Sequence, residues 1–200
     1  MRELGNGGRM GKGTVKMTMT PDEFLGWEIL QDDRYEFVGG ELFCHSGARK
    51  SHNLVAGNIF GALHTFLKGS PCKAFISEMK LQVTAADAFF YPDVMVSCDE
   101  RDARADLQLE HPCLIVEVLS DSTAAYDLGR KFEYYRLIPE LREYVVIEPG
   151  RQRIYRYLKN REGDWLLRDL LPGEPLSLSS VGCAIGQDDI FEGVPVPEAV

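Results

Sequence analysis

Asp93 and Glu117 are the two carboxylates whose positions in the sequence could support metal-dependent chemistry. Glu117 lies in the apolar segment 113–119 (CLIVEVL), which predicts a central strand buried on both faces. A carboxylate in such a strand is costly unless a cation or hydrogen bonds compensate its charge. Asp93 belongs to a second predicted strand, 91–97, whose alternation places it on the face opposite to the valines. For Glu117 taken alone, a structural salt bridge or a strand end that reaches solvent is the alternative interpretation.

Lys131 is a basic residue on the apolar face of the helix predicted over 122–138. A lysine in the middle of an apolar stripe points at the sheet, unless its stem runs along the helix to water. The buried acid Glu117 and this buried base therefore explain each other, either as an ion pair or as a catalytic set. At 100° per residue the stripe consists of Ala124, Leu128, Lys131, Tyr135 and Ile138.

Two carboxylates and one ammonium are the side chains that Mg²⁺-assisted hydrolysis of a phosphodiester requires. Asp93 and Glu117 would bind the cation, which polarises the phosphate and lowers the pKa of its water. Lys131 would orient the attacking water or stabilise the charge that forms. Mn²⁺ is a possible substitute for Mg²⁺ at such an oxygen site.

The composition is that of a globular protein, but its charge argues against a nucleic-acid substrate. Hydrophobic residues make up 44% and charged residues 26% of the 200 residues, enough for one α/β domain with a core. The formal net charge is −9. Proteins that bind DNA usually carry a basic surface, because neutralising phosphates supplies most of the affinity. A nuclease of this charge therefore needs a metal to offset its carboxylates and a clustering of its basic residues.

Local signals predict an α/β fold, a central mixed sheet flanked by helices, in one domain over residues 17–200. Thr20-Pro21-Asp22-Glu23 is typical of a helix start, with Thr20 as the N-cap. Gly39-Gly40 between two apolar pieces indicates a hairpin. The predicted elements in chain order are helix 20–30, hairpin 35–44, helix 51–67, strands 74–83, 91–97 and 113–119, helix 122–138, strand 143–147, and hairpin 153–158 with 165–170.

Residues 1–16 are Gly-rich and basic, and they predict a flexible arm, with Met17 and Met19 as alternative starts to Met1. This arm lacks the apolar stretch of a signal peptide, and runs such as 113–116 are too short to span a bilayer. The cysteines are odd in number and widely spaced, without a CxxC pair, which argues against a disulfide framework and a zinc site. We therefore expect a cytoplasmic protein with reduced thiols and no membrane association. The cysteines are Cys44, Cys72, Cys98, Cys113 and Cys183.

Five segments follow one another in a distinctive order and spacing: YEFVGGEL, SHNLVAGNIFGAL, YPDVMV, LIVEVLSDSTAAYDLGRKFEYY and EYVVIEP. Together they resemble one bacterial family, the Uma-type "putative restriction endonuclease" family, also known as domain-of-unknown-function family 820. The resemblance covers roughly residues 20–195, and its most specific part is EVLSDST followed by Asp127, Lys131 and Tyr135. It implies membership of the PD-(D/E)XK nuclease superfamily, with a restriction-endonuclease-like core and a divalent-metal site at strand ends.

The resemblance assigns roles to individual residues. Asp93 matches the Pro-Asp acid and Glu117 the acid of the (D/E)XK element. Glu36 matches an early acid that often joins the site, and His52 matches the histidine that opens the following helix. Without the resemblance, Glu36 could equally well be a surface acid beside a turn, and His52 could be a polar residue at a helix boundary. The position two after Glu117 is leucine, where the superfamily has lysine, and the resemblance implies that Lys131 replaces it.

Other residues are weaker candidates. Lys80 is the runner-up for the active-site lysine if its strand neighbours Asp93. Glu41 is either a supporting acid or a solvated one, and His45 has no role assigned. The hairpin 151–168 mixes arginines with aromatic residues, a pattern that suits nucleic-acid contact or the wet face of an antiparallel ribbon.

Two classes of function follow from these residues. The first is a Mg²⁺-dependent endonuclease that cleaves DNA with Asp93, Glu117 and Lys131. The second is a catalytically inactive module of the same fold that binds DNA or protein, with the same residues as a buried polar cluster. Restriction-type nucleases often pair so that two sites cut two strands, and residues 190–196 are apolar enough to join an interface. We therefore also expect a homodimer.

Overall fold

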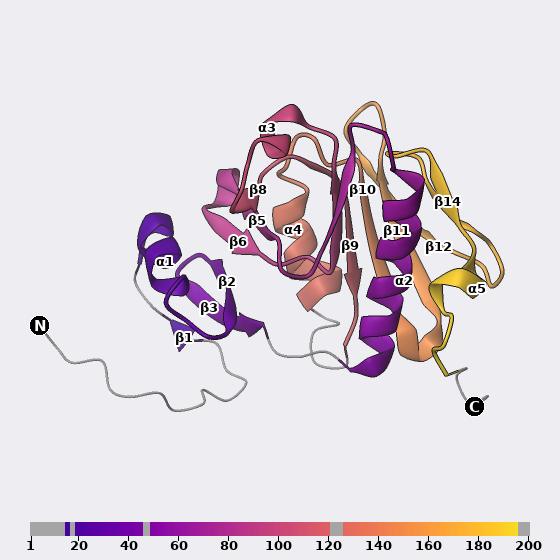
Figure 1. The fold of residues 1–200 in the computed structure, drawn as a ribbon, viewed down its shortest axis with the longest axis horizontal. Helices are drawn as coiled ribbons and strands as arrows, with labels where there is room; N and C mark the ends of the chain where they lie inside the picture. Colours follow the sequence, from indigo (N-terminus) through magenta and orange to yellow (C-terminus); the bar gives the residue numbers. More distant parts are fainter. Residues whose placement is uncertain (1–14, 17–18, 46–48, 121–125, 196–200) are drawn as a thin grey trace, which may run out of the picture.

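A six-stranded mixed sheet forms the centre of the molecule (Figure 1). This computed structural model describes residues 15–16, 19–45, 49–120 and 126–195. In the central sheet β9 and β10 are parallel, and the other neighbouring strands are antiparallel. The expected mixed sheet in an α/β fold is therefore confirmed. In spatial order the strands are β12 (Trp165–Asp169), β11 (Arg153–Lys159), β10 (Glu143–Glu148), β9 (Pro112–Val118), β7 (Val94–Ser97) and β4 (Lys73–Ile76).

A second sheet lies beside the first, on the left in Figure 1. It contains the predicted hairpin, which turns at Gly39 and Gly40 with φ of 56° and 83°, as a tight hairpin turn requires. Its first strand pairs with Leu42 and Glu41, so the expectation of a flexible arm is wrong for residues 15–16, while residues 1–14 lie outside the described residues. In spatial order the strands are β1 (Val15–Lys16), β3 (Glu41–His45), β2 (Arg34–Val38), β6 (Ala88–Phe90), β5 (Lys80–Val83) and β8 (Gln108–Leu109).

The single strand predicted over 74–83 is wrong, because the chain changes sheets in the middle of it. Ser77 adopts a φ of 50°, and its N–H donates to the carbonyl of Asp93 at 3.0 Å. The residues before this turn form β4 in the central sheet, and those after it form β5 in the second sheet. The next strand also differs from the expectation, since β7 begins at Val94 and leaves Asp93 in the connection before it.

The helices begin close to the predicted residues. Thr20 caps α1 (Pro21–Glu28): its side chain accepts from the Glu23 N–H, and the Glu23 carboxylate accepts from the Thr20 N–H. The long helix α2 (Lys50–Phe66) packs on the central sheet through Val55, Ile59 and Leu63. The remaining short elements are helices α3 (Glu100–Ala103) and α5 (Gln187–Ile190), 3₁₀ turns η1 (Thr84–Ala86) and η3 (Pro149–Arg151), and the hairpin of β13 (Leu176–Leu178) and β14 (Cys183–Ile185).

The helix predicted over 122–138 is not a continuous α-helix in its described part. It consists of a π-helical segment, η2 (Tyr126–Lys131), followed by α4 (Phe132–Tyr135). Residues 121–125 lie outside the described residues, and with them the predicted N-terminal turn. A π-turn holds more residues than an α-turn, and hydrophobic spacing does not reveal it. Lys131, Tyr135 and Ile138 are nevertheless all buried, as the stripe predicts.

Two apolar clusters cover opposite faces of the central sheet. Val116 and Val118 of β9 belong to the cluster under α2, whereas Ile115 belongs to the cluster under α4. Because side chains alternate along a strand, Glu117 faces the α4 side, where Lys131 and Tyr135 also lie. Among the described residues, no helix has the length and apolar composition needed to cross a bilayer.

Cys72 and Cys98 form a disulfide bond, which corrects the expectation that the cysteines are reduced. Their neighbours Lys73 and Ser97 are directly opposed in the antiparallel pair of β4 and β7, so the two thiols meet just beyond it. The sequence spacing of 26 residues carries no sign of this pairing, because it depends on the strand register. The free cysteines among the described residues are Cys44, Cys113 and Cys183.

The disulfide predicts a measurable loss of stability when one of its cysteines is replaced. Under non-reducing conditions Cys72→Ser should lower the free energy of unfolding by about 3 kcal/mol, because the cross-link restricts the unfolded chain over 26 residues. Urea unfolding of the variant beside Cys44→Ser, which removes a free thiol, measures this loss. Alkylation of the denatured, unreduced wild type should label three cysteines. Labelling of all five would contradict the bond.

Candidate active site

The five predicted site residues come together from separate elements. Glu36 comes from β2, Glu117 from β9, Lys131 from the end of η2, Asp93 from the connection before β7, and His52 from the first turn of α2. We call Glu36, Asp93, Glu117 and Lys131 the carboxylate cluster. Each of its four side chains belongs to a residue that is at most 5% exposed. The cluster therefore joins both sheets and the helix on the α4 side.

The ammonium of Lys131 bridges two of the carboxylates. Its Nζ lies 2.9 Å from Glu36 Oε1 and 3.0 Å from Glu117 Oε1. A buried charge is tolerated only when it is closely paired and hydrogen-bonded, and here the three groups satisfy one another. The ion pair proposed from the helical stripe is thus present, and it includes Glu36 as a second acid.

Asp93 is held beside Glu117 by the backbone of β9. The N–H of Val118 donates to Asp93 Oδ2 at 2.7 Å, and His52 Nε2 lies 3.2 Å from the same oxygen. Burial raises the pKa of Asp93, but the hydrogen bond and charge of His52, the Val118 N–H and Lys131 together outweigh it. The pKa of Asp93 therefore lies below its usual value, and the carboxylate is anionic at neutral pH.

Glu36 is not a surface acid, because it accepts the N–H of Tyr91 at 3.2 Å inside the protein. The hydroxyl of Tyr91 in turn donates to Glu28 at 2.7 Å. Glu28 is also the partner of Lys80, whose ammonium lies near the rings of the small core around α1. Lys80 is therefore part of a separate ion pair in the second sheet, and the runner-up assignment of this lysine to the active site is wrong.

Tyr135 contacts the carboxylate cluster, although its place in the helical stripe and in the family motif gave it no predicted role in the site. Its hydroxyl donates to Glu117 Oε1 at 2.7 Å, and the residue is fully buried. Burial and the charge of Glu117 raise the pKa of Tyr135 well above its usual value, so it stays a donor. The available signal was its place four residues after Lys131, on the same face of the helix.

The remaining candidates lie outside the cluster. Glu41 pairs with Arg130 across 3.9 Å at the surface. In the C-terminal hairpin, Arg153 pairs with Asp169 and Arg156 with the buried Glu143, so these two arginines already have carboxylate partners within the protein. The side chain of His45 is not among those described.

The donor set of the cluster suits a hard divalent cation. Mg²⁺ is usually bound by one or two carboxylates and keeps several waters, and here the buried Asp93 accepts the backbone N–H of Val118, the residue that follows Glu117. Among the described residues, no three His, Cys, Asp or Glu side chains form a ready-made metal cage. Asp93 and Glu117 could therefore hold Mg²⁺ only together with water, and the described residues do not form a closed structural zinc site.

Removal of the Lys131 charge should destabilise the fold strongly. Lys131→Met leaves Glu36 and Glu117 buried without their cation, a loss of about 3–5 kcal/mol in the free energy of unfolding. The double variant with Glu36→Gln should recover part of this stability, because it leaves one unpaired buried carboxylate in place of two. Urea unfolding measures both, with Lys68→Met at an exposed position as the control. A Lys131→Met midpoint equal to that of wild type would exclude the bridge.

Comparison with known proteins agrees with this architecture. Residues 21–185 match the model of the Uma2 family, described as "Putative restriction endonuclease". Two uncharacterized proteins of Synechocystis sp. (strain PCC 6803) are similar: slr1290 is 34% identical over 176 residues, covering 88% of this chain and 93% of its own length. The second, sll1609, is 35% identical over 155 residues, covering 76% and 88%.

A solved structure has the same fold. It is described as the crystal structure of "a putative nuclease belonging to DUF820" from Anabaena variabilis, and it superposes with a TM-score of 0.69 over 86% of this chain and 97% of that chain. The sequence identity is 17%, so this likeness concerns the fold alone. The family match over most of the chain confirms the resemblance seen in the sequence. This chain belongs to the Uma2 family of restriction-endonuclease-like proteins.

Proposed function

We propose that this protein is a metal-dependent endonuclease that hydrolyses phosphodiester bonds in DNA, with Mg²⁺ as its cofactor and Mn²⁺ as a substitute. The observation that carries the proposal is the carboxylate cluster, in which Asp93 is hydrogen-bonded to the backbone next to Glu117 and the ammonium of Lys131 pairs with Glu117. The proposal includes one nuclease domain over residues 17–200 and action in the cytoplasm. By analogy with restriction-type nucleases, it also includes a homodimer that cuts both strands.

The formal charges of the cluster favour a divalent cation. Its three carboxylates and one ammonium sum to −3 + 1 = −2, and a positive charge on His52 beside Asp93 still leaves −1. Asp93 and Glu117 would hold the ion that offsets this charge. When bound, such an ion polarises a phosphate oxygen and lowers the pKa of a coordinated water.

The protein's own side chains would position and polarise the reacting groups. His52 and the Val118 N–H fix Asp93, while Tyr135 fixes Glu117, so neither carboxylate has to reorganise when it binds the ion. Lys131 carries a positive charge beside Glu117, where it would orient the attacking water or stabilise the negative charge that develops on the phosphate. Glu36 holds the other side of that ammonium and sets its direction.

A non-catalytic module of the same fold is the second candidate. It is favoured by the close pairing of Lys131 with Glu36 and Glu117, which satisfies two of the three carboxylates without a metal. The net charge of −9 also favours it, because the overall field repels a polyanionic substrate. Metal binding and cleavage distinguish the two candidates.

A plasmid-nicking assay with Mg²⁺ or Mn²⁺ tests the nuclease. Asp93→Ala and Lys131→Ala should each reduce the rate by at least about 100-fold, the scale for losing one group that stabilises transition-state charge. The matched controls Asp106→Ala and Lys68→Ala, both at exposed positions, should nick like wild type.

Calorimetric titration with Mn²⁺ accompanies the nicking assay and reports on the metal independently of activity. We expect binding that is lost in Asp93→Ala and Glu117→Ala. Equal nicking by wild type and both site variants would point to a contaminating nuclease. Absence of Mn²⁺ binding that depends on Asp93 and Glu117 would leave the non-catalytic module.

Replacing Tyr135 by Phe should weaken metal binding without removing a ligand. The change deletes one hydroxyl that donates to Glu117, and loss of such a supporting contact typically costs about 10–100-fold in metal affinity or activity. The Mn²⁺ dissociation constant and the nicking rate measure this. Tyr134→Phe, one residue earlier and packed on Phe90, is the matched control. If both variants bind Mn²⁺ equally well, Tyr135 serves packing alone.

A further inference from the structure

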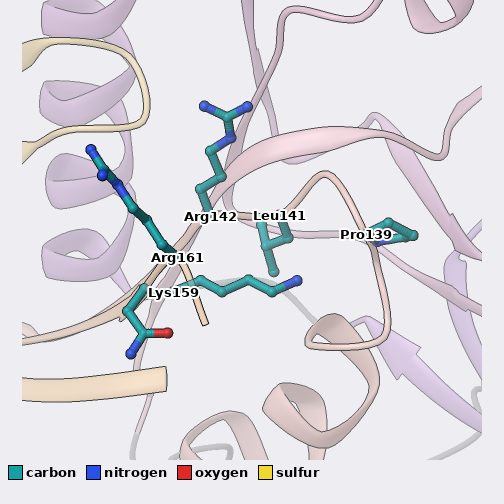
Figure 2. Close-up of a pocket in the computed structure, with 6 residues that line it drawn as sticks. Pro139, Leu141, Arg142, Lys159 and Arg161 are labelled. Atoms are coloured by element: carbon teal, nitrogen blue, oxygen red, sulfur yellow. The ribbon is translucent and has the colours of Figure 1, made fainter. Parts of the chain in front are cut away.

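A basic pocket lies at the end of the central sheet opposite to the carboxylate cluster (Figure 2). It has a volume of about 330 Å³, and no carboxylate lines it. It forms where β10 begins and β11 ends: the Lys159 N–H donates to the Arg142 carbonyl at 2.9 Å, and the Arg142 N–H donates to the Cys113 carbonyl at 3.0 Å. The lining residues are Pro139, Leu141, Arg142, Lys159, Asn160 and Arg161.

The three cations of this pocket differ from the basic residues of the neighbouring ribbon. Arg153, Arg156 and Arg168 each pair with a carboxylate. Within the described part of the chain, Arg142, Lys159 and Arg161 have no such ion pair. Unpaired basic side chains also occur singly at the surface, but here three of them share one pocket. Their charge is therefore available to a ligand.

Hydrogen bonds fix the backbone that carries the pocket residues. The Lys159 ammonium lies 5.9 Å from the centre of the Trp165 ring, and the turn after it is closed by hydrogen bonds between Asn160 and Asp164. Figure 2 shows the guanidinium groups of Arg142 and Arg161 extending in the same general direction, while the Lys159 side chain runs past Leu141. Arg142 and Lys159 lie at strand ends and Arg161 lies in this hydrogen-bonded turn, so the three groups need less ordering on binding than groups on a long loop.

The chemistry of these groups suits phosphate. A guanidinium presents a planar fork of donors that matches phosphate oxygens, and a lysine adds a point charge. In a chain with a net charge of −9, the overall field repels polyanions, so affinity for a phosphate backbone has to come from local clusters of cations. This pocket is such a cluster.

We propose that the pocket binds a phosphate of a nucleic-acid backbone, away from the position of cleavage. The pocket and the carboxylate cluster are both attached to β9: the Cys113 carbonyl accepts the Arg142 N–H, and Glu117 belongs to the cluster. These two residues of β9 are four positions, or about 13 Å, apart along the strand. A duplex carries one phosphate per strand for about every 3.4 Å of its axis, so DNA at the carboxylate cluster presents phosphates at this range. Only the identity of the ligand rests on the proposed function.

The experiment measures binding of a fluorescent duplex, without divalent metal, over about 50–200 mM KCl. Arg142→Gln and Arg161→Gln should each flatten the slope of log K against log salt by about 0.9, the value for one lost phosphate contact on B-DNA. Arg104→Gln, which removes the same charge at the exposed C-cap of α3, is the matched control and should keep the wild-type slope. Unchanged slopes in the pocket variants, a control that changes equally, or no duplex binding by wild type would each overturn the proposal.

Two further comparisons complete the experiment. One distinguishes a nucleic-acid phosphate from a free phosphate, and the other distinguishes failure of the pocket proposal from failure of the nuclease proposal. If pyrophosphate binds wild type but not Arg142→Gln/Arg161→Gln, while the duplex binds both with one slope, the pocket takes a free phosphate and the nucleic-acid assignment falls. If the pocket variants flatten the slope but nicking does not depend on Asp93, the pocket stands and the nuclease proposal fails. If nicking depends on Asp93 but the pocket variants leave the slope unchanged, the nuclease proposal stands and the pocket proposal fails.

Discussion

The structure depends on one buried cation, the ammonium of Lys131, which lies between Glu36 and Glu117. Glu36 belongs to the second sheet, Glu117 to the central sheet, and Lys131 to the helix that packs against both. Three elements that are distant in the sequence are thereby joined at one point. Because two carboxylates in an apolar interior are unfavourable without a partner, the position of this lysine constrains the sheets as well as the site.

Other buried carboxylates of this protein join elements in the same way, but each has its own complete set of partners. Glu28 is held by Lys80 and Tyr91, and Asp102 by His111 and the backbone after β8. Burial of an acid is therefore not by itself a sign of catalysis in this chain. The carboxylate cluster differs because it holds three acids and a single lysine, which pairs with two of them, so that an excess of negative charge is left. That excess is the physical reason for proposing a divalent cation there and not at the other buried acids, Glu28, Asp102 and Glu143.

Much of the fold and of the site could be predicted where the signal is local. The apolar segment around Glu117 and the helical stripe through Lys131 both indicate burial. Because a buried charge requires a partner of opposite charge, a buried acid and a buried base predict an ion pair. The hairpin at Gly39-Gly40 and the capped start of α1 follow from backbone chemistry within a few residues. The π-helical segment before α4 and the change of sheet at Ser77 could not be predicted, because the same apolar residues suit a continuous element equally well.

The sequence by itself determined that Glu117 and Lys131 are a buried acid and a buried base, the α/β class of the fold, and the family. Only the tertiary structure decided which side chains pair with one another: Lys80 with Glu28, Tyr135 with Glu117, and Cys72 with Cys98. It also decided that three unpaired cations surround one pocket at the far end of the sheet. The physical reason is that charge pairing, hydrogen bonding and disulfide formation act over a few ångströms. Strand register and sheet order bring residues to that distance, and spacing along the chain does not encode them.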